Sequence, residues 1–149
     1  MEDSNVTASA IISFVEQLED SSSRFYEGLA ERFADNRDRF LAFAKESGKN
    51  KELVIRTYQE TITDALEACY SFEGMRLQDY DVEHTLAGGA GYPEALKMAV
   101  ELEGKASQFY QDVAERGQAL LATIPRAFRK VADRRSKRKL ELQALLDRA

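Results

Sequence analysis

The sequence predicts a single all-α domain spanning residues 1–149, a four-helix bundle of two related helical hairpins joined by a long crossover. Three observations lead to this fold class. Apolar residues recur at helical spacing in four long stretches, the strongest break in that pattern falls once near mid-chain, and the two halves share an internal repeat. A chain of 149 residues with 44% hydrophobic and 32% charged residues is long enough to bury one core.

The first two helices are predicted from one continuous helical pattern with a single interruption. An apolar stripe runs through residues 11–33, and Thr7 or Ser9 is suited to cap its start. The Ala-Asp-Asn triplet at 34–36 offers a break and a new cap. Residues 40–72 then continue the same period, so the second helix is expected to be long.

The pattern fails over residues 73–93, which are expected to form the crossover. Residues 87–93 read Ala-Gly-Gly-Ala-Gly-Tyr-Pro and give the strongest punctuation in the chain. A structureless loop of this length is unusual in a compact domain, so residues 81–86 are expected to form a short helix or to pack across the bundle. One such long connection is expected to let the second and third helices run alongside each other.

The second hairpin is predicted from proline and glycine positions together with apolar spacing. The third helix is expected to begin near Pro93 or Glu94, because proline suits a first helical turn, and Gly117 is expected to end it. Thr123 and Pro125 are expected to open the fourth helix.

An internal repeat relates the first and third helices. Residues 18–32 align without gaps on residues 102–116, with Leu, Glu, Ser, Phe, Tyr, Ala, Glu and Arg matching in place. Chance seldom gives such a match. The chain is therefore interpreted as a duplicated helical hairpin.

Polar residues interrupt all four apolar stripes near mid-helix. The first and third helices each place one glutamate there, and the second and fourth each place two polar residues at i, i+3 spacing, which puts both on one face. Two glutamates and two arginines balance in charge, so we expect a buried layer in which guanidinium groups donate to carboxylates. The six residues of this expected layer are Glu19, Ser47, Asn50, Glu103, Arg135 and Arg138.

These residues lie within a motif that both halves carry. A Glu is followed six and seven residues later by Phe-Tyr, and the next helix carries Phe-x3-Ala, at Phe40 and again at Phe128. The pattern resembles the ferritin-like superfamily and its rubrerythrin-like di-iron carboxylate family over nearly the whole chain. That resemblance implies a Glu from the first helix of each hairpin and a Glu-x-x-His pair from the second. Glu19 and Glu103 match the two first-helix ligands.

The tyrosines of the repeat, Tyr26 and Tyr110, stand beside this motif. The resemblance implies that they are redox-active or donate hydrogen bonds to the central carboxylates. Amphipathic core filling with a satisfied hydroxyl is the interpretation we favour.

The chain departs from the family pattern at four of the six ligand positions. Ser47 and Asn50 stand where Glu and His belong, and Arg135 and Arg138 replace the other Glu and His. Arginine offers no lone pair and repels cations. Glu46 points about one helical position aside and does not restore the set.

The departures favour a non-catalytic bundle with a structural or protein-interaction role, without a cofactor or a bound metal, and assembled as a homodimer. The alternative is a rubrerythrin-like metal-binding oxidoreductase or iron-handling protein with an altered site. A third possibility is a small anion held by the central arginines. A single metal in the alternative would use Glu16, Asp20, Glu101 and Asp133.

The charge and the cysteine and histidine content of the chain indicate which partners and which cellular compartment to expect. The net charge of −5 argues against general nucleic-acid or acidic-membrane binding. The basic run from Arg126 to Lys139 is interpreted as a solvated face paired with acidic neighbouring helices. Aromatic residues do not interleave the basic residues on that face, so no nucleic-acid partner is expected. Cys69 is the only cysteine and is interpreted as a small buried hydrophobic residue. His84 is the only histidine and is interpreted as an ordinary surface residue. With neither a signal peptide nor a membrane span expected, we expect a cytoplasmic protein.

Overall fold

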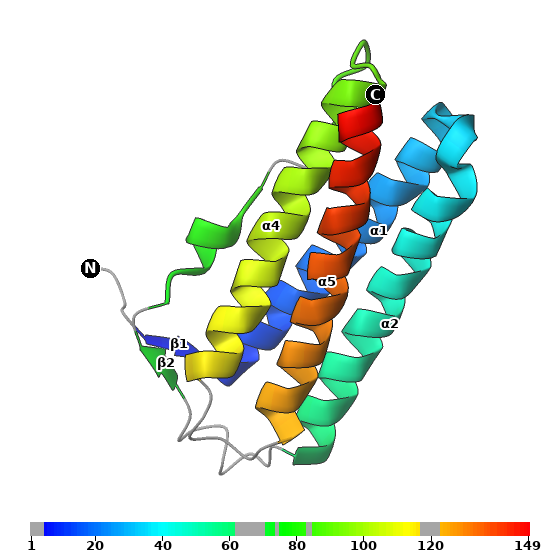
Figure 1. Cartoon of the computed structure of the whole chain (residues 1–149). Coiled ribbons are helices and arrows are strands. Elements are labelled where there is room, and N and C mark those ends of the chain that lie inside the picture. The colour runs from blue at the N-terminus through cyan, green and yellow to red at the C-terminus, as the bar shows by residue number, and fades with distance from the viewer. Residues whose placement is uncertain (1–4, 62–70, 74, 83–84, 117–122) are drawn as a thin grey trace.

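The computed structural model describes residues 5–61, 71–73, 75–82, 85–116 and 123–149. Four long α-helices dominate it (Figure 1), which confirms the all-α, four-helix prediction. The helices are α1 (Ala8–Arg32), α2 (Arg37–Thr61), α4 (Tyr92–Arg116) and α5 (Thr123–Arg148). Among the described residues, no helix combines the length and the apolarity needed to cross a bilayer.

The first hairpin follows the sequence pattern closely at its start. The hydroxyl of Thr7 accepts a hydrogen bond from the backbone N–H of Ala10 at 3.1 Å, so Thr7 rather than Ser9 is the cap of α1. At the other end, the N–H of Phe33 donates to the carbonyl of Leu29 at 2.8 Å. The predicted break is a short 3₁₀ helix, η1 (Ala34–Asn36).

The second helix is shorter than predicted. It ends at Thr61, and residues 62–70, including Cys69, lie outside the described residues. Strand β2 (Ser71–Glu73) pairs antiparallel with β1 (Asn5–Thr7), so the expected helix through residue 72 is wrong. Backbone groups that bond to a neighbouring strand cannot also close helical turns, and apolar spacing alone does not reveal that competition.

The crossover follows the second of the two alternatives expected for residues 81–86, because Val82 and Leu86 pack against the core of the bundle. A 3₁₀ helix, η2, forms over Leu77–Tyr80, whereas the described residues of 81–86 are not helical and residues 83–84 lie outside the description. Tyr80 explains the position of η2. Its hydroxyl donates to Asp112 of α4 at 2.6 Å, and its ring lies edge-on to Phe109 at 5.5 Å. These anchors are distant in sequence, which is why local spacing did not place the short helix.

Helix α4, the first helix of the second hairpin, begins at Tyr92, close to the start predicted near Pro93 or Glu94. The backbone N–H of Gly91 donates to the carboxylate of Glu94 at 3.0 Å, a contact that fixes the first turn of α4. Pro93 lies in that turn, where a missing N–H costs no helical hydrogen bond. Helix α4 ends at Arg116, and the predicted stop at Gly117 lies outside the described residues.

The four helices form a bundle in which each hairpin packs against the other. Helix α2 packs on α5, and α1 lies beside α4, where the rings of Phe14 and Phe109 are 4.7 Å apart. The crossover runs the length of the bundle, so α2 and α4 point in the same direction (Figure 1). They occupy diagonal corners, and the expectation that they run alongside each other is wrong. In this arrangement all four apolar stripes face one axis and each helix has antiparallel neighbours.

Candidate functional site: a buried glutamate–arginine layer

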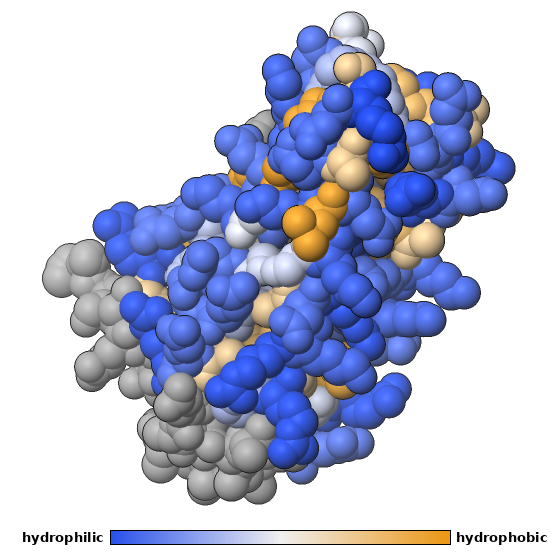
Figure 2. Space-filling view, in the orientation of Figure 1, coloured by the Kyte–Doolittle hydropathy of each residue, from blue (hydrophilic) through white to orange (hydrophobic). Residues whose placement is uncertain are grey.

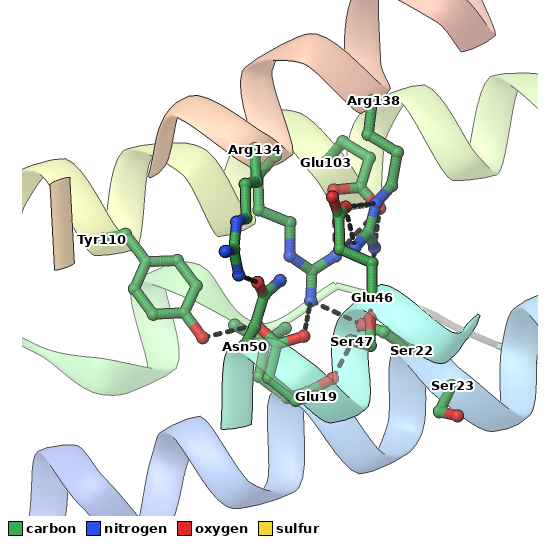
Figure 3. Close-up of polar contacts among 12 residues, drawn as sticks. Glu19, Ser22, Ser23, Glu46, Ser47, Asn50, Glu103, Tyr110, Arg134 and Arg138 are labelled. Atoms are coloured by element: carbon green, nitrogen blue, oxygen red, sulfur yellow. Dashed lines mark hydrogen bonds and ion pairs between the residues drawn. The ribbon is translucent and has the colours of Figure 1, made fainter. Parts of the chain in front are cut away.

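The six polar residues singled out from the sequence lie together in the middle of the bundle (Figure 3). All are buried, with at most 1% of any residue exposed. Each helix contributes, so the layer crosses the whole core. The six residues are Glu19 of α1, Ser47 and Asn50 of α2, Glu103 of α4, and Arg135 and Arg138 of α5.

Arg135 occupies the centre of this layer. Its Nη1 donates to both carboxylate oxygens of Glu103, at 2.9 and 2.8 Å. Its Nη2 donates to Oε1 of Glu19 at 2.8 Å and to the hydroxyl of Ser22 at 3.0 Å. One guanidinium group therefore joins a carboxylate from each hairpin, the planar multiple contact for which arginine is suited.

Arg138 ties the layer to α2. Its Nη1 donates to Oε2 of Glu103 at 3.2 Å and to the hydroxyl of Ser47 at 3.1 Å. Its Nη2 and Nε donate to Oε1 of Glu46 at 2.7 and 3.2 Å. The guanidinium also lies 5.5 Å from the ring centroid of Tyr26 and 5.4 Å from that of Phe43.

Residues outside the predicted six also join the layer, among them Glu46 and Ser22. Glu46 was placed aside, yet its side chain is 35% exposed and reaches inward to Arg138 at the rim of the layer. Ser22 lies within the apolar stripe predicted for residues 11–33, but its hydroxyl accepts from Arg135 and donates to the carbonyl of Leu18 at 2.7 Å. A buried hydroxyl inside an apolar stripe was the available signal, because such groups need partners.

The two tyrosines of the repeat cross between the hairpins. The hydroxyl of Tyr26 in α1 donates to Glu103, and that of Tyr110 in α4 donates to Glu19. Both side chains are fully buried. Burial raises the pKa of each tyrosine well above its ordinary value, and the adjacent carboxylate raises the pKa further. Both hydroxyls are therefore donors over the physiological pH range.

A second pair of equivalent contacts lies within the two hairpins rather than between them. The hydroxyl of Ser23 donates to the carbonyl of Ala44 at 3.3 Å. In the other hairpin, the hydroxyl of Ser107 donates to the carbonyl of Ala132 at 3.4 Å. These four residues are equivalent in the aligned repeats, so the two hairpins pack internally in the same way.

At the rim of the layer, two contacts between α2 and α5 also join equivalent positions of the two repeats, although the residue types differ between the halves. Arg138 bonds Glu46 from one side, and Arg134 donates to Oδ1 of Asn50 at 2.9 Å from the other. In the alignment of Phe40 with Phe128, these two pairs occupy equivalent positions. One half supplies the cations and the other half supplies their partners.

The charges of the layer stabilise one another. Burial by itself raises the pKa of Glu103, but Arg135 and Arg138 outweigh it and hold the pKa below the ordinary value. Burial works in the opposite direction on the arginines, yet Glu103 raises the pKa of both above the ordinary value. Glu103 and both guanidinium groups therefore remain charged in the core.

Two buried donors of the layer have no hydrogen-bond partner within the described part of the chain. They are Nδ2 of Asn50 and Nε of Arg135. An unpaired buried donor costs about 1–3 kcal/mol. The unpaired polar groups of the layer are thus N–H donors, which offer no lone pair to a metal ion.

The di-iron site that the family resemblance implies does not fit these residues. Arg135 and Arg138 stand at two ligand positions and donate to the carboxylate oxygens that a metal would need. Within the described residues, no group of three or more His, Cys, Asp or Glu could hold a metal ion. His84 lies outside the described residues.

The acidic residues considered for a single metal lie on the outside of the bundle. Glu16, Glu101 and Asp133 are exposed, and Asp20 is half-buried. The carboxylate of Asp20 pairs with Lys51 at 2.8 Å and raises the pKa of that lysine. These four side chains are not gathered into one site.

The buried tyrosines make the layer sensitive to alkaline pH. Because the pKa of Tyr26 and of Tyr110 is raised in the folded chain, the stabilisation is complete below the unfolded value of about 10 and is lost as the pH rises beyond it. We expect both phenols to ionise only as the bundle unfolds, followed by tyrosinate absorbance alongside circular dichroism. Tyr80, whose pKa burial also raises, should titrate late as well.

The Tyr26→Phe/Tyr110→Phe variant is the matched control for that titration. It should lose two late-titrating groups and show a weaker decline of stability at alkaline pH. Early titration of both phenols in the folded wild-type chain would contradict the hydrogen bonds to Glu19 and Glu103.

Comparison with known proteins found no relative of this chain. No protein-family model, curated protein or solved structure matches the chain. The residues and contacts of the layer therefore carry the functional argument.

Proposed function

We propose that the chain is a degenerate ferritin-like bundle of the rubrerythrin-like type, in which a buried Glu/Arg network replaces the di-metal site. Its role in this proposal is non-catalytic: it is a structural or protein-interaction module that assembles as a homodimer. The retained glutamates, the crossed tyrosines and the repeated serine contacts support a duplicated hairpin of this type.

The observation that carries the proposal is the position of Arg135. Its guanidinium group lies between Glu19 and Glu103, the two glutamates that match family ligands, and bonds both. A metal ion bridging these carboxylates would have to occupy the same space and face a fixed positive charge. The arginine thus supplies the positive charge that a metal would supply in a di-iron protein.

The network has a physical role that does not require chemistry. Buried ion pairs add little net stability compared with apolar packing, because desolvation offsets their attraction. A shifted helix register, however, would strand buried charges at a cost of several kcal/mol. The layer therefore favours one register of the four helices, which suits a rigid scaffold.

Metal analysis separates this proposal from its alternative, a metal-binding oxidoreductase or iron-handling protein with an altered site. The full chain is purified without chelator and its iron, manganese and zinc are measured by mass spectrometry. The proposal predicts less than about 0.1 metal ion per chain, because the layer offers no open ligand set. Stoichiometric metal that disappears in a Glu19→Gln/Glu103→Gln variant would support the alternative and overturn the proposal.

A further inference from the structure

One face of the bundle carries a stripe of basic residues outside the buried layer. Along α5 they follow i, i+4, i+8, i+11 spacing, which places them on one side of the helix. Two more lie two turns apart on α2, which packs against α5. We call these six residues the basic face: Lys49, Arg56, Arg126, Lys130, Arg134 and Lys137.

Contacts between α2 and α5 show that the two parts of the basic face are adjacent. Arg134 bonds Asn50, the residue next to Lys49, and Arg138, next to Lys137, bonds Glu46. All of the basic face is exposed except Arg134, which is half-buried. The two parts of the basic face therefore lie on neighbouring helices that pack against each other.

The basic face outnumbers the acids that lie one helical turn from its residues. Three of these acids are the exposed residues Glu52 and Glu60 of α2 and Asp133 of α5. Within the described part of the chain, none of the six residues of the basic face forms an ion pair. Two of the nearby acids are already paired, Glu46 with Arg138 and Glu141 with Arg39 at 3.0 Å.

In the basic run from Arg126 to Lys139, Arg135 and Arg138 do pair with acids of neighbouring helices, as expected. The members of that run that belong to the basic face form no such pair among the described residues.

The reason is a segregation of charge across the bundle. Helix α2 has six basic and four acidic residues and α5 has nine and three, whereas α1 has two and five and α4 has three and five. The crossover, with Asp79 and Asp81, lies along α1 and α4. Helices α2 and α5 together carry an excess of basic residues, and α1 and α4 together carry an excess of acidic ones. The net charge of −5 therefore does not cancel the basic face at its own surface.

The chemistry of this surface indicates what binds it. Protein–protein hot spots favour aromatics and are poor in lysine, and single-stranded nucleic acids stack on aromatics. No aromatic residue interrupts the basic face on α2 or α5. The view in Figure 2 is mostly hydrophilic, with scattered apolar patches rather than a broad one. Such a surface matches phosphates, which lysine and arginine contact without reading bases.

We propose that the basic face binds the phosphate backbone of a double-stranded nucleic acid without sequence preference. Its stripe on α5, from Arg126 to Lys137, spans about 17 Å at 1.5 Å per residue. That length matches about five steps of a duplex strand at 3.4 Å each. Apart from Arg134, which bonds Asn50 at the rim of the layer, this binding uses residues that do not contact the layer, so it stands independently of the proposed function.

Fluorescence anisotropy of the full chain with labelled duplex DNA and duplex RNA of about 20 base pairs tests the proposal. A micromolar Kd is expected at low salt, and log K should fall against log salt with a slope of about −4.5 to −5.5 for five or six phosphate contacts on duplex DNA. The Lys130→Glu/Lys137→Glu variant should bind at least about tenfold more weakly and with a shallower salt slope.

The matched control is Arg24→Glu/Lys97→Glu, which makes the same charge change at exposed residues of α1 and α4. It should bind within about threefold of the wild type, because these sites lie away from the basic face. Circular dichroism verifies that both variants fold.

Four outcomes would overturn the proposal. They are the absence of saturable duplex binding, equal losses in both double variants, binding to polyglutamate as tight as to the duplex, and tighter binding to phosphatidylserine vesicles than to the duplex. The last two would assign the surface to an acidic protein or to a membrane instead.

Discussion

Replacing Arg135 with methionine is expected to lower the free energy of unfolding by about 3–5 kcal/mol. The change leaves Glu19 buried without a cationic partner and leaves Glu103 with Arg138 alone. Neither glutamate is exposed, so water cannot replace the lost hydrogen bonds without a rearrangement of the core. Urea unfolding of the two chains, followed by circular dichroism, measures the difference.

Two further variants give reference values for the loss of unfolding free energy at Arg135. Arg138→Met should cost less, because Glu103 keeps Arg135, and Glu46 is exposed enough to turn to water. Lys137→Met, the exposed neighbour on the same helix, should change the free energy of unfolding by no more than about 0.5 kcal/mol. A loss at Arg135 no larger than that at Lys137 would show that the buried network is not what holds the core.

Placing the ligands of the proposed ferritin-like alignment in the buried layer is expected to create a metal site there. The variant carries Ser47→Glu, Asn50→His, Arg135→Glu and Arg138→His, which supplies two Glu-x-x-His pairs facing the retained glutamates. Six N and O donors then surround the mid-core layer. Cobalt(II) titration should show binding at least about 100-fold tighter than in the wild type, with a stoichiometry near two per chain.

Stability provides the second measurement for this variant. Without metal, four buried glutamates repel one another and the bundle should be strongly destabilised. With metal, the melting temperature should rise with concentration, because binding stabilises only the folded chain. Adding Glu19→Gln and Glu103→Gln removes two ligands and should abolish both effects. A folded variant that binds no metal would contradict the alignment with the ferritin-like ligand positions.

The buried layer was accessible from sequence because helical periodicity is strict. Glu19 and Glu103 fall at equivalent places in the repeat, and Ser47 and Asn50 share a face through i, i+3 spacing. A polar residue on a buried stripe needs a partner, so opposite charges in four facing stripes are expected to meet. The structure brings these residues together at hydrogen-bond distance.

Other features depend on tertiary geometry that local patterns do not encode. Glu46 enters the layer because a long side chain reaches across one helical position, and Tyr26 bonds Glu103 of the opposite hairpin. The strand pairing of residues 71–73 is formed with residues 5–7, far away in sequence. The placement of α2 beside α5 likewise decides which charges are neutralised, and it left the basic face unpaired.

The central claim is that Arg135 and Glu19 hold the two hairpins together by direct pairing, and a double-mutant cycle measures this most directly. The cycle compares the free energies of unfolding of the wild type, Arg135→Met, Glu19→Gln and the double variant. In the double variant Glu103 keeps Arg138 and position 19 carries no charge, so part of the single loss should be recovered. The account predicts a coupling energy of about 2 kcal/mol or more. Additive losses, with a coupling energy below about 0.5 kcal/mol, would contradict it.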